Sequence, residues 1–319
     1  MARILITGVT GFIGSHLAPE LAADHEVYGL VRPVARSGAD LPAGVRAAAG
    51  DLTDPQSVRH VLRTVDPEVV VHLAAATHVS HSFDHPYLYV STNIHGTLHL
   101  AHGLVDLGLA GRTHLVYAST AEVYGIQPPG PVREDASLEP SSPYANSKSM
   151  TDTYLRMMGP VYGLRATLLR SVNSYGRRRD QGFLIEYLVT AMLRGETVYL
   201  GMPESVRTYM HVDDHVAAYR AAVERPETAG EVFNISPGET VTNREVCLRL
   251  AALLDYDPGR IVFGEYPPGY PNRPAPSDQP SIELDASKAR RQLGWRPRVS
   301  LDDGLRRTVE RWRAQLGTG

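Results

Sequence analysis

The stretch Thr7-Gly8-Val9-Thr10-Gly11-Phe12-Ile13-Gly14 joins a short apolar segment to a segment with helical periodicity. Its three glycines stand three residues apart. Glycine permits a tight turn there and lets backbone N–H groups approach a pyrophosphate, which then faces the N-terminus of the following helix. At the first strand–helix junction, this spacing predicts a dinucleotide-binding loop. The loop residues expected to bind the cofactor are Gly8, Thr10, Gly11, Phe12, Ile13 and Gly14.

Outward from this loop, strand and helix signals alternate through the first half of the chain. Such alternation implies right-handed crossovers and a doubly wound, parallel α/β sheet of the Rossmann type. The expected strands are Arg3–Thr7, Glu26–Val31, Val45–Ala48, Val69–Leu73, Leu115–Ala118 and Ala166–Arg170. The expected helices are Phe12–Ala23, Pro55–Thr64 with Asp54 as its cap, Asn93–Leu107 and Tyr144–Tyr162.

The alternation loosens after about residue 172, where prolines and glycines become denser between elements. We expect a dinucleotide-binding domain over residues 1–172 and a smaller α/β substrate-binding domain over residues 173–319, with some segments returning to the first domain. The helices expected in this half are Leu184–Arg194, Asp214–Val223 capped by Asp213, Asn243–Asp255, Ser287–Leu293 and Leu301–Gln315.

Composition excludes several classes of function. The 35 acidic and 32 basic residues give a net charge of −3, so no basic field predicts a nucleic-acid partner. The single cysteine, Cys247, excludes an internal disulfide and a thiolate zinc site, and we expect it in the core. No apolar stretch approaches the roughly 18 residues that a membrane span needs, and no signal-peptide pattern is present, so we expect a cytoplasmic protein.

A histidine cluster suggests a metal site only at first sight. His78, His81 and His85 lie close together in the sequence, but the stretch lacks a periodicity that would bring three ligands to one point. We therefore expect no metal.

The segment Tyr144-Ala145-Asn146-Ser147-Lys148 places a phenol and an ammonium group on one face of a helix. A phenol with a pKa near 10 is a poor base at neutral pH, and a neighbouring cation favours its ionised form. Only two of the 32 basic residues, Lys148 and Lys288, are lysines, which makes a specific role for Lys148 more plausible than a general need for charge. Tyr144 is the predicted base, and Lys148 is expected to assist it and to bind the cofactor ribose.

The end of the second strand indicates which dinucleotide binds. An acidic residue there binds a ribose hydroxyl, whereas an arginine accepts a 2′-phosphate. Arg32 follows Val31 and no acid stands at this place, so we expect NADP, with NAD as the alternative.

The glycine spacing, the Gly-Phe-Ile-Gly sequence and the Tyr-Lys pair resemble the extended branch of the short-chain dehydrogenase/reductase superfamily. Stretches from His72 to Val79 and around Arg207 and Arg273 are most similar to the GDP-mannose 4,6-dehydratase family. The resemblance implies further cofactor contacts at Asp51, Leu52, Leu73, Ala74 and Ala75, in addition to Tyr144 and Lys148. It implies substrate contacts at Thr77, His78, Val79, Asn173, Arg207 and Arg273.

The implied reaction is 4,6-dehydration of a nucleotide-diphosphate hexose. Thr120 would position the C4 oxygen, and Glu122 would remove the C5 proton before water leaves C6. In dTDP-glucose dehydratases an aspartate, absent here, occupies the position of Ala121; GDP-mannose dehydratases also lack it. Thr208-Tyr209 follows Arg207 in place of the usual Asp–aromatic pair, which leaves the substrate open.

Three alternatives use the same motifs. A nucleotide-sugar 4-epimerase would not need Glu122, and a 4-keto-sugar reductase would consume NADPH. A binding module would keep the fold without the chemistry, which the intact Thr120, Tyr144 and Lys148 argue against. By analogy with the superfamily, helices Asn93–Leu107 and Tyr144–Tyr162 predict a homodimer or homotetramer.

Overall fold

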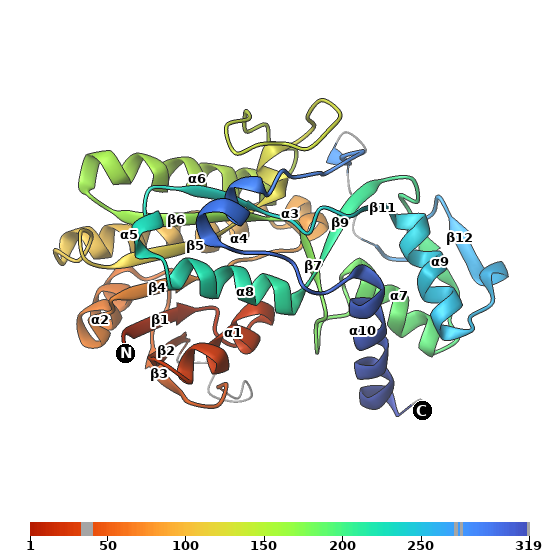
Figure 1. The fold of residues 1–319 in the computed structure, drawn as a ribbon, viewed down its shortest axis with the longest axis horizontal. Coiled ribbons are helices and arrows are strands. Elements are labelled where there is room, and N and C mark those ends of the chain that lie inside the picture. Colours follow the sequence, from red (N-terminus) through yellow and green to blue (C-terminus); the bar gives the residue numbers. More distant parts are fainter. Residues whose placement is uncertain (33–40, 271–273, 275–276, 318–319) are drawn as a thin grey trace.

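A seven-stranded sheet forms the centre of the computed structural model, which describes residues 1–32, 41–270, 274 and 277–317 (Figure 1). The strand order is β10-β6-β5-β4-β1-β2-β3, and every neighbouring pair is parallel. The strands are β1 (Arg3–Thr7), β2 (Glu26–Val31), β3 (Val45–Ala49), β4 (Val69–His72), β5 (His114–Thr120), β6 (Arg165–Ser171) and β10 (Val232–Ile235). This confirms the expected doubly wound α/β fold.

Helices cover both faces of the sheet because successive side chains of a buried strand point to opposite sides. In β1, Ile4 and Ile6 join the core beneath one helical layer, whereas Leu5 joins the core beneath the other. The first layer contains α1 (Phe12–Ala22) and α8 (Val212–Val223). The second contains α2 (Pro55–Val65), α5 (Gly96–Asp106) and α6 (Pro143–Tyr162).

The second half of the chain builds a separate core beyond the carboxyl edge of the sheet (Figure 1). Its helices are α7 (Leu184–Leu193), α9 (Asn243–Leu254) and α10 (Leu301–Leu316). Its strands are β7 (Asn173–Tyr175), β8 (Val198–Leu200), β9 (Val206–His211), β11 (Thr240–Thr242) and β12 (Ile261–Phe263), in the sheets β11-β9-β7 and β12-β8. Cys247 is buried in this core, and burial raises the pKa of its thiol to about 12.

Two elements of the second half, α8 and β10, pack against the first sheet. The strand β10 pairs with β6 from Val232 to Ile235. The Asp214 carboxylate on α8 accepts the backbone N–H groups of Arg298 and Val299, at 2.8 and 3.0 Å. The chain therefore crosses between the two bodies several times.

Helix boundaries differ from expectation at two informative places. The expected helix Asn93–Leu107 begins earlier, as a π-helical turn over Val90–His95 that leads into α5.

The prediction that Asp213 caps α8 is wrong. His211 is the cap, because its backbone is extended and its Nδ1 accepts the N–H of Asp213 at 3.3 Å. Asp213 lies instead in the first turn, where its charge favours the helix dipole.

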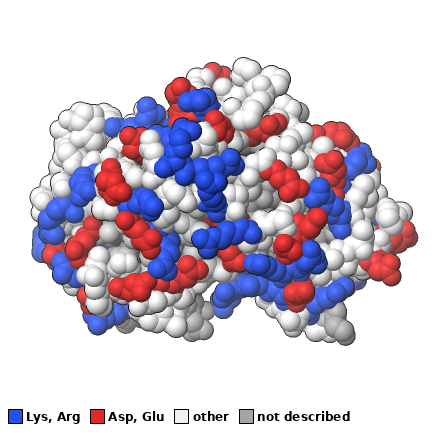
Figure 2. All heavy atoms as spheres, in the orientation of Figure 1, with Lys and Arg blue, Asp and Glu red and all other residues white. Residues whose placement is uncertain are grey.

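Short helical turns make up the remaining connections. They are α3 (Val79–Asp84), α4 (Pro86–Tyr89), η2 (Val90–His95), η3 (Ala121–Tyr124), η4 (Pro226–Thr228), η5 (Pro258–Arg260) and η7 (Ala289–Leu293). Within the described ranges, no helix combines the length and apolarity needed to cross a membrane. Figure 2 shows acidic and basic side chains interspersed over one face of the molecule, as the net charge of −3 leads us to expect.

Candidate active site

The glycine loop leaves no room for side chains at its two ends. Gly8 has a φ of +70°, and a Cβ atom there would lie 2.8 Å from the backbone nitrogen of Ala74. A Cβ atom on Gly14 would lie 2.3 Å from the carbonyl oxygen of Gly8. Among the described side chains, none caps α1 at Gly11. The first N–H groups of α1 therefore face the loop, an arrangement that fits a dinucleotide pyrophosphate.

A chain of hydrogen bonds holds this loop against β4. The Thr97 hydroxyl donates to the Asn93 carbonyl at 2.5 Å, so it accepts from His72 Nε2 at 2.9 Å. His72 Nδ1 then accepts from the Thr7 hydroxyl at 2.6 Å, and Thr7 accepts from the N–H of Ala74 at 3.2 Å. Burial lowers the pKa of His72 to about 3, with a contribution from the nearby lysine of α6. A neutral imidazole therefore fixes Ala74 beside Gly8.

The ends of β2 and β3 bring Arg32 and Asp51 together. The Asp51 carboxylate accepts the N–H and the hydroxyl of Thr53, both at 2.8 Å. These bonds, and then the charge of Arg32, lower the pKa of Asp51. Leu52 is buried next to them. The residues expected on the adenosine side of the cofactor thus share one edge of the sheet with the glycine loop.

Thr120, Glu122 and Tyr144 meet at the end of β5. Thr120 ends the strand, and its Oγ1 accepts the N–H of Glu122 at 3.3 Å. The Tyr144 hydroxyl shares a hydrogen bond with Thr120. Burial raises the pKa of Tyr144, and the charge of Glu122 raises it further, whereas the Thr120 bond and Arg177 oppose the rise. Tyr144 is therefore a neutral phenol in this structure.

Lys148 follows Tyr144 by one turn of α6 but contacts other groups. Its Nζ donates to the carbonyl of Ala118 at 2.7 Å and lies 4.8 Å from the ring centre of Tyr117. Only 4% of the residue is exposed. Burial lowers the pKa of Lys148 to about 7, although Asp152 opposes the shift. The Lys148 ammonium therefore gains or loses a proton near neutral pH.

Asn93 joins the helices of the site to the loop after β4, a role that the sequence analysis missed. Its Oδ1 accepts the N–H of Ala76 at 2.8 Å, and its Nδ2 donates to the Ala76 carbonyl at 3.0 Å. The same Nδ2 donates to the Ser147 hydroxyl on α6 at 2.9 Å. Asn93 lies in the π-helical turn, and such turns are frequent at functional sites. Sequence periodicity gives no sign of this turn.

Gln279 links two residues that the sequence analysis assigned to separate tasks. Arg207 donates to the carbonyls of Val206 and Gln279, both at 2.8 Å. The Gln279 side chain is fully buried and donates from Nε2 to Glu122 Oε2 at 3.1 Å. The separation of 157 residues between Glu122 and Gln279 hides this contact from any local motif.

A second missed residue, Arg177, lies in the loop after β7, and its side chain reaches Phe12 at the glycine loop. Its guanidinium carbon is 3.4 Å from the ring centre of Phe183 and 4.3 Å from that of Phe12. Glu186 accepts the N–H of Arg177 at 2.9 Å. Arg177 is thus a buried cation within electrostatic range of Tyr144. A run of three arginines in the sequence gives no sign of which one is buried.

The expected substrate contacts are distributed around this edge. His78 Nε2 pairs with Asp180 at 3.1 Å, and the His78 ring lies 4.5 Å from that of Phe183. Thr77 is exposed, and Val79 begins α3. Asn173 is exposed at the start of β7. Arg273 lies outside the described residues.

Comparison with known proteins finds similarity to nucleotide-sugar dehydratases and epimerases. Residues 5–308 match a family model described as GDP-mannose 4,6 dehydratase. A dTDP-glucose 4,6-dehydratase from Streptomyces griseus is 35% identical to this chain, over 96% of this chain and 93% of the relative.

Solved structures agree in fold over nearly the whole chain. A dTDP-glucose 4,6-dehydratase from Streptomyces venezuelae, solved with NAD, has a TM-score of 0.87 and 34% identity, covering 99% of this chain and 98% of that one. A UDP-glucose 4-epimerase from Thermotoga maritima, solved with UDP-glucose, has a TM-score of 0.86 and 33% identity, covering 98% of this chain and 99% of that one.

Proposed function

Because this chain belongs to the extended short-chain dehydrogenase/reductase family, in the branch of nucleotide-sugar dehydratases and epimerases, we propose that it is an NADP-dependent nucleotide-hexose 4,6-dehydratase. One observation carries the choice of dehydration. The Glu122 carboxylate, bonded to the Gln279 amide, lies within electrostatic range of Tyr144 and next to Thr120. An epimerase needs no second proton-transfer group at this place.

The residues of the site divide the chemistry between them. The glycine loop would hold the cofactor pyrophosphate, and Lys148 would hold its ribose. When bound, the dinucleotide would supply reversible hydride transfer, out of C4 of the hexose and back to C6. Tyr144 removes the proton of the C4 hydroxyl, and Thr120 donates a hydrogen bond that positions the C4 oxygen. Because Tyr144 is a neutral phenol in the free protein, it would lose its own proton before this step, and the charge of Arg177 favours the tyrosinate that then acts as the base.

Elimination would use Glu122 twice. The C4 ketone acidifies the C5 proton, which Glu122 removes as a base. Glu122 then delivers this proton to the C6 hydroxyl, which leaves as water. After hydride returns to C6, C5 takes up one proton, which balances the proton that Tyr144 removed from the C4 hydroxyl. Ala121 offers no acid for this second step, so a single carboxylate performs both transfers. The Gln279 amide orients that carboxylate by its bond to Oε2.

The choice of NADP rests on Arg32. This guanidinium follows β2 and lies beside Asp51, where a 2′-phosphate on the adenosine ribose would accept its hydrogen bonds. The relative from Streptomyces venezuelae was solved with NAD, so titration with both cofactors is the direct test. We expect Arg32→Ala to weaken binding of NADP more than binding of NAD.

Arg207 is the proposed partner of the substrate diphosphate, together with Arg273. Arg207 is nearly buried and bonded to two carbonyls, which hold its planar guanidinium in one orientation. Asn173, Thr77, His78 and Val79 are the proposed hexose and phosphate contacts. GDP-mannose is the first substrate to test, because the matched family model is described by that reaction.

Mass spectrometry of products tests the proposal. The enzyme is incubated with GDP-mannose, dTDP-glucose and UDP-glucose, each with NADP and with NAD. Loss of one water from one hexose supports a dehydratase and identifies its nucleotide. Unchanged mass with a new isomer would establish an epimerase instead. Consumption of NADPH by a 4-keto sugar, without turnover of any hexose, would establish a reductase.

The variant Glu122→Gln tests the role of the carboxylate. We expect it to reduce bound cofactor on adding substrate, yet to release no dehydrated product. Glu310→Gln is the matched control, since Glu310 is exposed on α10. Full dehydration by Glu122→Gln would contradict the assigned role.

We also propose a homodimer formed through α6 and the helical run that continues from α4 through η2 into α5, which contains the predicted helix from Asn93. Leu88, Met150 and Val161 are each more than half exposed on these helices, and apolar side chains that group on one surface are typical of a protein–protein interface. Light scattering of the purified protein measures the mass directly, and a mass of four chains would indicate the homotetramer. A monomer at micromolar concentration would contradict this proposal.

A further inference from the structure

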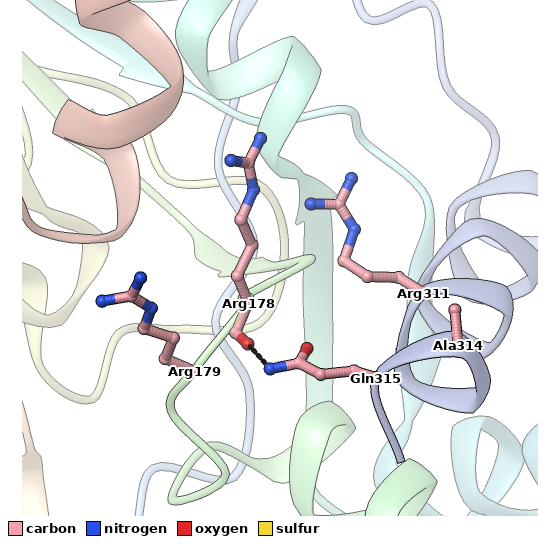
Figure 3. A pocket seen from close by; sticks show the side chains of 5 residues that line it. All are labelled: Arg178, Arg179, Arg311, Ala314 and Gln315. Carbon is pink, nitrogen blue, oxygen red and sulfur yellow. Dashed lines mark hydrogen bonds between the residues drawn. The ribbon is translucent and has the colours of Figure 1, made fainter. Parts of the chain in front are cut away.

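A surface cavity of about 500 Å³, open to solvent, lies between the loop after β7 and the helix α10, and exposed arginines dominate its lining. The lining residues are Arg178, Arg179, Arg311, Ala314 and Gln315. Figure 3 shows the side chains of Arg178 and Arg311 extending in the same direction, with Arg179 on the opposite side of the loop. No acidic residue is part of the lining.

The three guanidinium groups have no carboxylate partner. Within the described part of the chain, no Asp or Glu oxygen lies within 4.0 Å of Arg178, Arg179 or Arg311. The charge of Asp213 acts on Arg311, but Asp213 is already paired with Arg307 at 2.9 Å and with His211 at 3.3 Å. The grouping of three such arginines leaves concentrated positive charge without compensation at this place.

Contacts with Gln315, Glu186 and Phe183 fix the loop that forms one wall of the cavity. Gln315 on α10 donates from Nε2 to the backbone carbonyl of Arg178 at 2.8 Å, as Figure 3 shows. The preceding residue, Arg177, is fixed by Glu186 on α7 and by stacking on Phe183. The backbone that carries Arg178 is therefore ordered before any ligand binds, which lowers the entropic cost of binding.

This cavity is separate from the sites already assigned to anions. Arg207 lies four residues before His211 on β9, which is roughly 13 Å along the strand. The cavity lies at the His211 end, because Arg178 follows Tyr175, the register partner of His211. Arg32 acts on Asp51 at the adenosine edge of the sheet, whereas Arg178 and Arg311 act on His16, which lies in α1 beyond the residues of the glycine loop. The assignments made above therefore give these arginines neither the cofactor phosphates nor the substrate diphosphate to bind.

We propose that Arg178, Arg179 and Arg311 form a binding site for a phosphate-bearing anion, distinct from the dinucleotide loop and from Arg207. Phosphate fits better than a carboxylate, since its two negative charges and several oxygens match more than one planar guanidinium. A bound phosphate would connect the loop that carries Arg177 to α10. It would thereby restrain the cation that faces Tyr144.

Isothermal titration of the cofactor-saturated protein tests this site, with inorganic phosphate and inorganic pyrophosphate as probes. Ionic strength is held constant with chloride. We expect saturable phosphate binding that weakens at least about tenfold in Arg178→Gln/Arg311→Gln. Pyrophosphate that binds about tenfold more tightly than phosphate would assign a diphosphate ligand, and equal affinities would assign a phosphomonoester. The assay uses no nucleotide sugar, so its outcome is independent of the proposed function.

Arg313→Gln is the matched control, because Arg313 is exposed on the same helix but does not line the cavity. If the double variant unfolds, the single variant Arg179→Gln provides the same comparison at an exposed position. The proposal is overturned if phosphate binds the wild-type protein no better than these cavity variants, or if Arg313→Gln weakens binding equally.

Discussion

Replacing Lys148 with methionine tests whether the buried ammonium destabilises the cofactor-free protein. Burial lowers the pKa of Lys148 to about 7, against 10.5 as the ordinary value. A difference of this size corresponds to about 5 kcal/mol between the charged and neutral forms. Below about pH 7 both folded and unfolded chains hold the proton, so the native state bears the whole cost. Above that pH the folded protein releases the proton first, and the cost falls until the unfolded chain also releases it.

The variant Lys148→Met removes this titration while keeping a side chain of similar length. Between about pH 6 and about pH 8.5, the cost of the charge falls from about 5 to about 3 kcal/mol. The stability advantage of Lys148→Met over the wild type should therefore shrink by about 2 kcal/mol across this range. Urea unfolding followed by circular dichroism measures both proteins at both pH values.

The other lysine of the chain supplies the control. Lys288 is paired with Glu231 at 2.7 Å, so Lys288→Met removes an ion pair rather than an isolated buried charge. A difference between Lys148→Met and the wild type that stays constant with pH, or grows as the pH rises, would refute the argument.

Three further predictions concern the sheet and its helices. Gly14→Ala should destabilise the protein by about 1–3 kcal/mol, because its Cβ atom would overlap the loop backbone, and it should abolish cofactor binding. Gly111→Ala is the control, because a Cβ atom there meets nothing within 4 Å, and it should change neither property. Thermal unfolding measures the stability of both variants, and cofactor titration measures their binding. Asp152→Leu should cost about 3–5 kcal/mol in urea unfolding, since it leaves Arg170 buried without its partner at 2.7 Å, and wild-type stability would contradict this. Burial lowers the pKa of His215 to about 3, so between about pH 6 and pH 4 only the unfolded chain takes up its proton, and this group contributes a loss of stability of about 1.4 kcal/mol per pH unit. Because buried His72 titrates in the same way, His215→Phe should reduce the slope of stability against pH by about 1.4 kcal/mol per pH unit without removing it, and an unchanged slope in acid titrations would count against the assignment.

The parts of this protein that sequence could predict are those specified by local pattern. The glycine loop depends on residues within eight positions. Its spacing predicts places where a side chain would not fit, and in the structure a Cβ atom on Gly8 or Gly14 would overlap neighbouring backbone. The Tyr144–Lys148 spacing likewise follows from one turn of helix. The parallel sheet follows from alternating elements, and its seven strands confirm that prediction.

Residues whose function depends on distant contacts could not be predicted in this way. Gln279 reaches Glu122 only because the chain returns to the first sheet after residue 277. Asn93 acts through a π-helical turn, and the hydrophobic pattern of the sequence does not reveal the extra residue of such a turn. His211 displaced Asp213 as the cap of α8 because an imidazole nitrogen can accept an N–H as a carboxylate does. In each case the deciding contact is tertiary, or depends on an irregular backbone.

The position of β10 at the edge of the large sheet imposes an order on synthesis of the chain. Its partner β6 ends at Ser171, and β10 ends at Ile235, so ribosomes need about 3–13 s to make the intervening residues. During that interval the backbone of β6 has one unpaired edge, and such edges recruit strands from other chains. The nascent dinucleotide-binding sheet is therefore completed only after much of the second body has been translated. Slow codons between residues 171 and 235 would prolong that exposure, and aggregation during expression would increase with it.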